Sequence, residues 1–320
     1  MKKILIVGAG GQIGSELVPH LRSIYGNNNV VAADISAEKC KALAEAGPFE
    51  ELNALDGEGF SAIGKKYNID TNLVALLSAT GEKNPKLAWD INIGALTNSL
   101  YIAKDNNCAV FTPSSIGAFG NDTPKDKTPQ DTLQRSNTTI YGVCKVTGEL
   151  LSDYYFNRFG VDTRSVRFPG LISYVTLPGG GTTDYAVEIY YDAIRKGSFT
   201  CNVKEGTYMD MMYMPDALNA VVQLMEADPS KLKHRNSFNI ASMSFEPEQI
   251  AAEIRKHLPD FKMDYQIDPV KQAIANSWPN SMDDTCAREE WGWAPKFDLT
   301  SMTNDMLIKV KEKFDKGLIK

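Results

Sequence analysis

The feature that most constrains this chain is a glycine-rich turn close to the N-terminus, set between two regular segments. Residues 2–7 form an apolar run typical of a buried strand, and residues 12–25 repeat apolar side chains at helical spacing. A strand, a tight glycine turn and a helix make up the first part of a βαβ unit, in which the helix N-terminus can bind a pyrophosphate. The turn therefore predicts an α/β fold that binds a dinucleotide.

The glycines follow a G-x-x-G-x-x-G pattern at Gly8, Gly11 and Gly14, and not the commoner G-x-G-x-x-G, because position 13 is isoleucine. Glycine suits such a turn because a side chain would block the phosphates or the contact between helix and strand. We expect the cofactor to contact these three glycines together with Gln12 and Ile13. The alternative is a glycine turn with a purely structural role.

An acidic residue at the end of the next expected strand, residues 28–34, strengthens the dinucleotide interpretation. Asp34 follows Gly14 by twenty residues. A carboxylate at this place can accept hydrogen bonds from both ribose hydroxyls and would repel a 2′-phosphate. No arginine is adjacent to it in the sequence. We therefore expect NAD as the cofactor, although Asp34 as a simple strand-end cap is the alternative.

The first half of the chain continues to alternate apolar runs with amphipathic segments, which is typical of βαβ units. Strands are expected at 73–79 and 108–115, helices at 86–106 and 141–159, and a strand with its turn at 161–170. Beyond residue 170 the elements become shorter. We predict a Rossmann-type doubly wound parallel sheet over residues 1–170, with later segments crossing back into it. Residues 171–320 should mainly form a smaller, mixed α/β substrate-binding lobe.

Composition excludes some partners. The net charge of −6 argues against a nucleic-acid partner. No apolar stretch approaches the roughly 20 residues that span a bilayer, and the run after Lys3 is too short for a signal peptide. We expect no membrane partner and a cytoplasmic location. The five cysteines and three histidines have no ligand-type spacing, so no metal site is predicted.

A tyrosine and a lysine stand four residues apart at Tyr141 and Lys145. If the segment is helical, the two side chains share one face. A nearby ammonium favours the phenolate, which would let the tyrosine act as a base, and Lys145 could also hold the nicotinamide ribose. The alternative is an ordinary pair on a surface helix.

Ser115 follows an expected parallel strand, at the sheet edge that faces the ligand crevice in open α/β sheets. A serine hydroxyl there can orient a substrate hydroxyl and stabilise a developing alkoxide. A Ser-Ser pair after a strand is by itself only a turn. Its combination with the glycine turn and with Tyr141 and Lys145, however, makes chance a poor explanation.

With these motifs in place, the sequence resembles the extended form of the short-chain dehydrogenase/reductase superfamily, which includes the nucleotide-sugar epimerases. Asn92 and Gly94, in residues 90–94, resemble the asparagine segment of that superfamily, and residues 167–170 its strand-end motif near the nicotinamide. The resemblance implies an NAD-dependent enzyme and a homodimer. It also implies cofactor contacts with Asp56, Leu77, Ser78, Ala79, Asn92, Tyr141, Lys145 and Pro169.

Five longer segments resemble one branch of that superfamily, the short-chain-type L-threonine 3-dehydrogenases: residues 76–85, 111–120, 167–174, 179–190 and 277–293. These enzymes oxidise the β-hydroxyl of threonine with NAD. The resemblance implies Ser115, Tyr141 and Lys145 as catalytic residues. It implies substrate contacts with Ser78, Ser115, Tyr141, Thr182, Thr183 and Trp278.

The residues themselves agree with a small amino-acid substrate. Thr182 and Thr183 can donate hydrogen bonds to a carboxylate, and they follow a triple glycine at 179–181. Asp184 could accept from the substrate ammonium or simply cap the next helix. Trp278 could exclude water or belong to the core.

Two other functions stay open at this stage. A nucleotide-sugar 4-epimerase or dehydratase would need basic residues for the substrate pyrophosphate. Residues 176–192 contain no arginine or lysine, although Arg195, Arg235 and Arg288 lie elsewhere. A non-catalytic dinucleotide-sensing module could keep the glycine turn but would not need Ser115, Tyr141 and Lys145.

Overall fold

The computed structural model describes residues 3–69, 71–74, 84–134, 136 and 138–319. Its helices are α1 Gln12–Tyr25, α2 Lys41–Ala46, α3 Gly57–Tyr67, α4 Pro85–Asn106, α5 Ile140–Phe159, α6 Tyr185–Lys196, α7 Met214–Glu226, α8 Pro247–His257, α9 Pro269–Ser277, α10 Thr285–Trp291 and α11 Leu299–Asp315. Short 3₁₀ helices are η1 Asn27–Asn29, η3 Ile116–Ala118 and η4 Thr182–Asp184. Its strands are β1 Ile4–Val7, β2 Val30–Asp34, β3 Phe49–Glu51, β4 Thr71–Val74, β5 Ala109–Phe111, β6 Ser114–Ser115, β7 Thr163–Arg164, β8 Val166–Phe168, β9 Gly170–Ile172, β10 Ser198–Cys201, β11 Met209–Tyr213, β12 Phe238–Asn239, β13 Met243–Phe245 and β14 Lys262–Tyr265.

The main sheet of the described chain has six strands in the order β3-β2-β1-β4-β5-β7. All of its neighbouring strands pair in parallel. The chain runs outward from β1 to β3 on one side and from β4 to β7 on the other, so the strand order reverses between β1 and β4. In doubly wound sheets the ligand crevice opens at this point, beyond the carboxyl ends of the strands. The predicted Rossmann-type doubly wound parallel sheet is confirmed.

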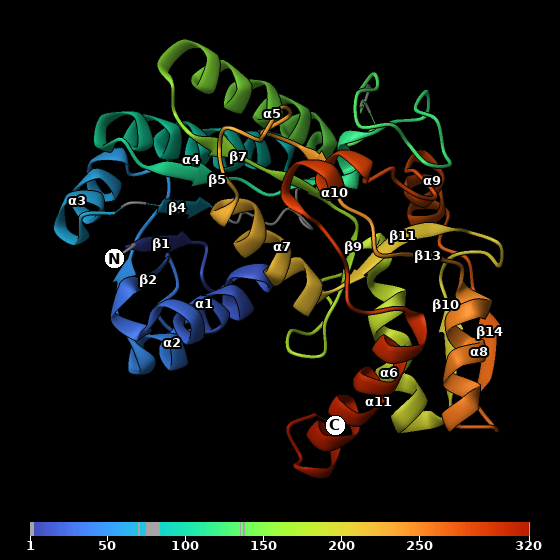
Figure 1. Cartoon of the computed structure of the whole chain (residues 1–320). Coiled ribbons are helices and arrows are strands. Elements are labelled where there is room, and N and C mark those ends of the chain that lie inside the picture. The colour runs from blue at the N-terminus through green and yellow to red at the C-terminus, as the bar shows by residue number, and fades with distance from the viewer. Residues whose placement is uncertain (1–2, 70, 75–83, 135, 137, 320) are drawn as a thin grey trace.

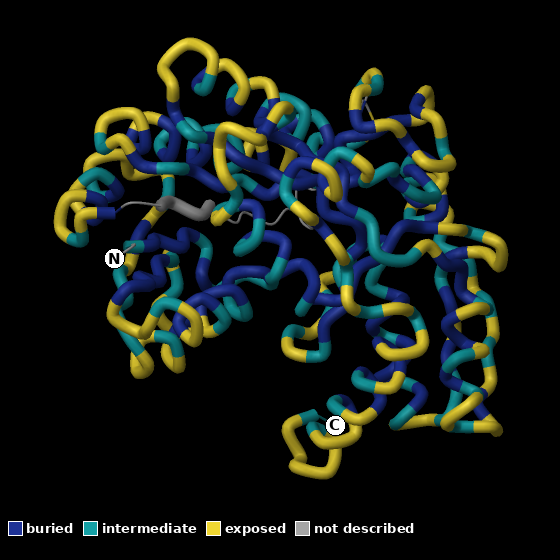
Figure 2. The backbone as a smooth tube through the Cα atoms, in the orientation of Figure 1, coloured by how far each residue is buried: buried dark blue, intermediate teal, exposed yellow. Residues whose placement is uncertain are grey.

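Helices cover both faces of this sheet (Figure 1). Ile4 and Ile6 of β1 belong to the core shared with α1 and α7, whereas Leu5 and Val7 belong to the core shared with α3 and α4. Successive side chains of a strand point to opposite faces, so a strand buried on both sides must be apolar throughout. β1 and β2 accordingly run through the buried interior in Figure 2.

The second lobe is built around a smaller mixed sheet and lies to the lower right in Figure 1. β11 pairs in parallel with β9 and antiparallel with β13, and a separate parallel pair joins β10 to β14. The core of this lobe includes the fully buried rings of Tyr185, Tyr190 and Tyr213. The Tyr190 hydroxyl bonds to Thr303 of α11, 2.8 Å away, and the Tyr213 hydroxyl donates to Asp305, 2.6 Å away.

The segment 161–170, expected to be one strand and a turn, is divided among three sheets. β7 extends the main sheet beside β5, β8 lies between β6 and β12, and β9 joins the second lobe. Pro169 separates the last two strands, and proline has no N–H to donate to a ladder. This segment therefore connects the six-stranded main sheet to the second lobe.

The expected helices agree closely with the structure: α1 has the predicted bounds, and α4 and α5 each begin one residue earlier than predicted. The strand expected at 73–79 begins at Thr71 as β4, and residues 75–79 lie outside the described residues. Later segments do return to the first core, because α7 packs against α1 and because Phe238 and Trp293 belong to the same core cluster. The boundary at residue 170 stays a prediction. No helix of the described chain is long and apolar enough to cross a membrane.

Candidate active site

The glycine turn brings the N-terminus of α1 against the end of β1. Gly8 has a φ of +81°, which L side chains rarely adopt. The N–H groups of Gly8 and Ala9 both donate to the Ala33 carbonyl, at 2.9 and 3.0 Å. A Cβ on Gly14 would lie 2.3 Å from the Gly8 carbonyl oxygen. Only glycine at position 14 therefore allows this close approach of helix and turn.

The first turn of α1 presents its backbone to a ligand. Within the described chain, the N-cap residue Gly11 has no side chain to accept hydrogen bonds from the first N–H groups of the helix, and no acidic residue occupies this turn. Uncapped N–H groups at the positive end of a helix dipole favour phosphate. Gln12 begins the helix, and Ile13 is buried against the core of β1. These residues fit a dinucleotide pyrophosphate.

Asp34 ends β2 beside this turn. Its Oδ2 accepts from the Gly10 N–H, 2.8 Å away, and its Oδ1 accepts from the Ser36 N–H, 2.9 Å away. A carboxylate has about four lone-pair sites, so these two bonds leave room for ribose hydroxyls. The strand-end role and the ribose role are therefore compatible, and the ribose contact stays a prediction.

Ser115 lies on a short strand that follows β5. After β5 the chain turns at Pro113 and enters β6, which pairs in parallel with β8. Ser115 is the N-cap of η3, and its Oγ accepts from the Gly117 N–H, 3.1 Å away. A hydroxyl has one donor and two acceptor sites. Ser115 therefore keeps hydrogen-bonding capacity for a substrate oxygen.

Helix α5 begins against this same segment. A Cβ on Gly142 would come within 2.5 Å of the Gly117 carbonyl oxygen, so glycine lets the first turn of α5 lie against η3. A Cβ on Gly117 would lie 3.0 Å from Cε1 of Tyr141 and 3.5 Å from Oγ of Ser115. The Tyr141 ring and the Ser115 hydroxyl thus border the same glycine.

Lys145 lies one helical turn beyond Tyr141 on α5, as the spacing predicts. Its Nζ is 5.2 Å from the centroid of the Tyr141 ring and donates to the Pro113 carbonyl, 2.6 Å away. A cavity of about 30 Å³ adjoins Lys145 and is bordered by Asn92 of α4. This volume is enough for about one water molecule. The structure brings Ser115, Tyr141 and Lys145 together, and their catalytic roles stay predictions.

A buried ion pair lies behind Ser115. Arg167 of β8 donates through Nε and an Nη atom to the two carboxylate oxygens of Glu149 on α5, at 3.1 and 3.0 Å. The side chains are only 6% and 5% exposed. Glu149 also accepts from the Ser114 hydroxyl, and the Arg167 guanidinium lies 4.8 Å from the centroid of the Phe119 ring. The pair therefore contacts the chain on both sides of Ser115.

Sequence reasoning did not find Glu149. It stands four residues after Lys145, so both side chains share one face of α5. That spacing is the only local signal, and it does not distinguish a buried carboxylate from a solvated one. The partners, Ser114 and Arg167, come from distant parts of the chain, so only the folded structure identifies this network.

Two of the predicted substrate residues follow the triple glycine. Thr182 is buried, and a Cβ on Gly170 would lie 2.7 Å from Cγ2 of Thr183. The Thr183 side chain therefore lies against Gly170, the first residue of β9, which directly follows Pro169. The Asp184 Oδ2 accepts from the N–H groups of Gly180 and Gly181, both at 2.7 Å. Asp184 therefore stabilises the preceding turn, and its side chain does not cap α6. A contact with a substrate ammonium stays a prediction.

Trp278 follows α9 and reaches the catalytic segment. Its indole packs in a cluster with Ile116, Phe119 and Met282. Ile116 begins η3, and Phe119 directly follows it, so both residues come shortly after Ser115 in the chain. Core packing and a position beside the active site are therefore compatible for this tryptophan.

The remaining predicted cofactor residues have varied surroundings. Asp56 is the N-cap of α3 and accepts from the Gly59 N–H, 3.0 Å away. The Asn92 side-chain amide donates to the Ala88 carbonyl, 2.8 Å away on the same helix. Leu77, Ser78 and Ala79 lie outside the described residues. The cofactor contacts of all these residues stay predictions.

The parallel sheet, its glycine turn and the neighbouring serine, tyrosine and lysine define a dinucleotide-dependent enzyme of the short-chain type. A family model described as the NAD dependent epimerase/dehydratase family matches residues 4–241. The chain belongs to this family. The predicted superfamily resemblance is therefore confirmed, and a nicotinamide dinucleotide is the cofactor of such enzymes.

Individual proteins of this family and related solved structures are similar to this chain over nearly its whole length. An uncharacterized epimerase/dehydratase of Staphylococcus haemolyticus is 58% identical over 98% of this chain and 99% of its own length. The solved structure of an L-threonine dehydrogenase from Clostridium difficile has a TM-score of 0.95 and 56% identity, covering 98% of both chains. One from Phytophthora infestans has a TM-score of 0.93 and 46% identity, covering 98% of this chain and 100% of that one. The chain is thus an NAD-dependent oxidoreductase of the epimerase/dehydratase family.

Proposed function

We propose that this protein is an NAD-dependent L-threonine 3-dehydrogenase, which oxidises the β-hydroxyl of L-threonine to give 2-amino-3-ketobutyrate. Its similarity to structures of L-threonine dehydrogenases over nearly the whole chain supports the substrate. The observation that carries the chemistry is the shared contact of Tyr141 and Ser115 at Gly117, with Lys145 one helical turn away.

In the proposed reaction, Tyr141 removes the proton from the β-hydroxyl while Ser115 orients that hydroxyl by a hydrogen bond. The ammonium of Lys145 lies 5.2 Å from the centroid of the Tyr141 ring. When bound at the glycine turn, the cofactor supplies the acceptor for the hydride that leaves Cβ. Positioning of the reactants contributes most to the rate, and base catalysis adds roughly 10²–10⁴-fold.

Asp34 supports NAD over NADP as the cofactor. Its carboxylate sits between the backbone N–H groups of Gly10 and Ser36, where a 2′-phosphate would meet a fixed negative charge. Asp34→Ala should therefore weaken NAD binding and reduce the preference for NAD over NADP. Fluorescence titration with both dinucleotides measures this selectivity.

The Thr182–Thr183 segment supports a small zwitterionic substrate. Its hydroxyls can donate to a carboxylate, and residues 176–192 carry no arginine or lysine for a sugar-nucleotide pyrophosphate. The Asp184 carboxylate, which holds the turn of Gly180 and Gly181, is the candidate acceptor for the substrate ammonium.

The deciding experiment follows NADH formation with NAD and a panel of L-threonine, D-threonine, L-serine and UDP-sugars. Reduction with L-threonine is the expected result. Turnover of a UDP-sugar without threonine oxidation would contradict the proposal and favour the epimerase or dehydratase alternative. NAD binding without turnover of any substrate would favour a dinucleotide-sensing module.

We also propose that the protein is a homodimer that associates through α4 and α5. These neighbouring helices expose large apolar side chains, including Trp89 and Tyr101 on α4 and Leu150, Tyr154 and Phe159 on α5. Such a patch favours a protein interface. Light scattering should give twice the chain mass, and Leu150→Glu with Tyr154→Glu should reduce it to the monomer mass.

A further inference from the structure

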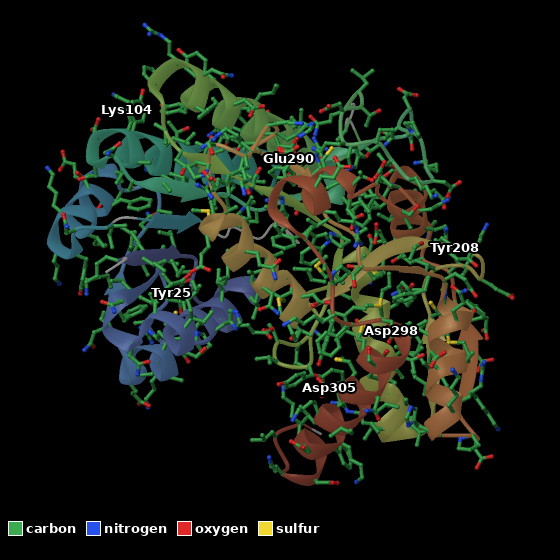
Figure 3. All side chains as sticks on the ribbon, in the orientation of Figure 1. Tyr25, Lys104, Tyr208, Glu290, Asp298 and Asp305 are labelled. Carbon is green, nitrogen blue, oxygen red and sulfur yellow. The ribbon has the colours of Figure 1, made fainter. Side chains whose placement is uncertain are left out.

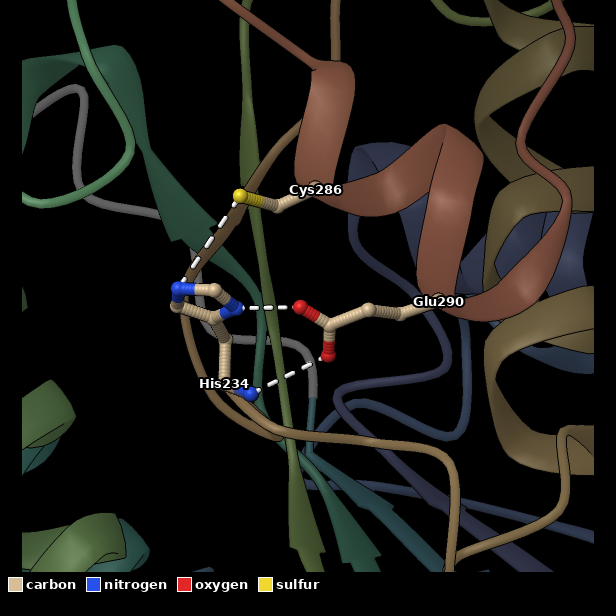
Figure 4. A group of neighbouring side chains, drawn as sticks. All are labelled: His234, Cys286 and Glu290. Atoms are coloured by element: carbon tan, nitrogen blue, oxygen red, sulfur yellow. Dashed lines mark hydrogen bonds and ion pairs between the residues drawn. The ribbon is translucent and has the colours of Figure 1, made fainter.

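Three potential metal ligands meet at a place that the proposed reaction does not use. His234 follows α7, and Cys286 and Glu290 lie one turn apart on α10 (Figure 4). One ligand atom from each lies within 4.8 Å of the others. Glu290, which is also labelled in Figure 3, is nearly buried. Sequence spacing predicted no metal site, because His234 is far from Cys286 in the chain.

Glu290 fixes the orientation of the imidazole. Its Oε1 contacts Nδ1 of His234, and its Oε2 accepts from the backbone N–H groups of Lys233 and His234, at 2.6 and 3.1 Å. A carboxylate on Nδ1–H holds the ring as in carboxylate–histidine–zinc triads, and an ion at Nε2 would replace the proton that this nitrogen shares with Asp131. The other ring nitrogen is therefore the one prepared for a cation.

Nε2 faces a thiol and a second carboxylate. It lies 3.9 Å from the Cys286 Sγ and 3.2 Å from the Asp131 Oδ2. Zinc bonds of about 2.0–2.1 Å to nitrogen and about 2.3 Å to sulfur put tetrahedral ligands about 3.3–3.6 Å apart. The two distances from Nε2 agree with this spacing to a few tenths of an ångström, and the Asp131 carboxylate would turn toward Cys286 to share an ion with it. The Asp131 side chain is 83% exposed, so its carboxylate can adjust around an ion.

The charge of the surroundings also favours a cation. The carboxylates of Glu290 and Asp131 both lie against the imidazole of His234, beside the Cys286 thiol. Their negative field attracts a divalent ion. A bound ion would in turn displace the thiol proton into solvent, because thiolate is the form that ligates metals.

We propose that His234 Nε2, Cys286 Sγ and the Asp131 carboxylate bind a divalent transition-metal ion of the zinc type, with Glu290 orienting the histidine. Nitrogen and sulfur donors select this class over magnesium or calcium. The ion would tie α10 to the segment after α7 and to the loop before α5. The backbone carbonyl of Gln130, the neighbour of Asp131, accepts from Arg167 at 3.0 Å. The site therefore lies next to the buried ion pair of Arg167 and Glu149.

The test uses the reactivity of Cys286, which is the only partly exposed thiol among the five described cysteines, the other four being buried. The full chain is dialysed against a chelator and alkylated under native conditions with and without Zn²⁺, and intact mass is followed over time. Zinc should slow the single alkylation at least tenfold, and the chelator should restore it. Equal alkylation rates with and without zinc would overturn the proposal.

Two variants separate a metal site from nonspecific protection. His234→Gln can still donate to Glu290, so it should fold and alkylate normally but lose the zinc protection. Asp131→Asn changes only an exposed side chain and should weaken protection about tenfold. The matched control His257→Gln, at the end of α8, should behave as wild type. Full protection in His234→Gln would exclude the histidine as a ligand and overturn the site. With Co²⁺ in place of Zn²⁺, a thiolate charge-transfer band is expected that is missing in Cys286→Ser.

Discussion

The glycine turn and the corner formed by Ser115, η3 and the start of α5 both belong to the proposed active site, but they are built differently. The turn is made within 34 residues by the close backbone approach of Gly8 and Gly14 and by the Asp34 carboxylate, which accepts from the Gly10 N–H. The corner assembles η3, α5 and β8 through the buried pair of Glu149 and Arg167. The first depends on small residues and on neighbours in sequence. The second depends on charges that are stable only when each has its distant partner. Substitutions in the two regions should therefore fail in different ways.

The largest expected effect separates chemistry from cofactor binding. Tyr141→Phe removes the phenol that takes the substrate proton, so kcat should fall by about 10²–10⁴-fold. The affinity for NAD should change little, because the glycine turn is untouched. Steady-state kinetics and fluorescence titration with NAD measure the two effects. Near-normal turnover would contradict the base assignment.

The second prediction concerns the buried ion pair of Glu149 and Arg167. Glu149→Ala leaves the Arg167 guanidinium buried without its carboxylate, and breaking such a pair costs about 3–5 kcal/mol. We expect a loss of this size in the free energy of unfolding, and a lower kcat because Ser114 loses its partner. Denaturant unfolding measures the first. Glu312→Ala, on an exposed face of α11, should change stability by less than about 0.5 kcal/mol.

A stability change for Glu149→Ala as small as that of Glu312→Ala would remove the distinction between the two regions. Rescue of kcat by Glu149→Gln, with stability partly restored, would show that the hydrogen bond to Ser114 matters more than the charge. A structural effect alone would lower stability in both Glu149 variants without this recovery of kcat.

The third prediction concerns the turn. Gly14→Ala places a methyl group 2.3 Å from the Gly8 carbonyl oxygen, so α1 must move away from β1. Overpacking of this kind costs about 1–3 kcal/mol, and NAD affinity should fall more than tenfold. Gly64→Ala in α3 is the matched control, because its Cβ would meet Ile102 at an ordinary 3.4 Å. Equal NAD affinities for these two variants would contradict the role of Gly14.

The smallest effect concerns Glu16, which joins α1 to the second lobe. Burial raises its pKa from 4.5 to about 7, against the opposing effects of its hydrogen bond from Ser173 and of Lys313. Between these values the folded chain binds more protons than the unfolded chain, so stability should fall as the pH rises from about 4.5 to 7. Thermal unfolding across this range should show a shallower decline in Glu16→Gln. Parallel curves would show that other groups set the slope.

The two regions also differ in how far they could be predicted from sequence. The bounds of α1 and the place of Asp34 follow from periodicity and from glycine spacing, because these contacts are local. The segment 161–170 was predicted as one strand and a turn, yet it contributes to three sheets. Its partners β5, β6, β11 and β12 lie far away in the chain, so no local pattern records the division.

The sequence by itself determined the parallel α/β fold, the cofactor turn and the helical spacing of Tyr141 and Lys145, since each depends on backbone sterics or on the periodicity of helix and strand. Only the tertiary structure decided that Ser115 and Tyr141 border the same glycine, that Glu149 pairs with Arg167, and that His234 meets Cys286. Side chains distant in sequence are brought together by burial of the sheets and helices between them, and burial depends on the whole chain at once.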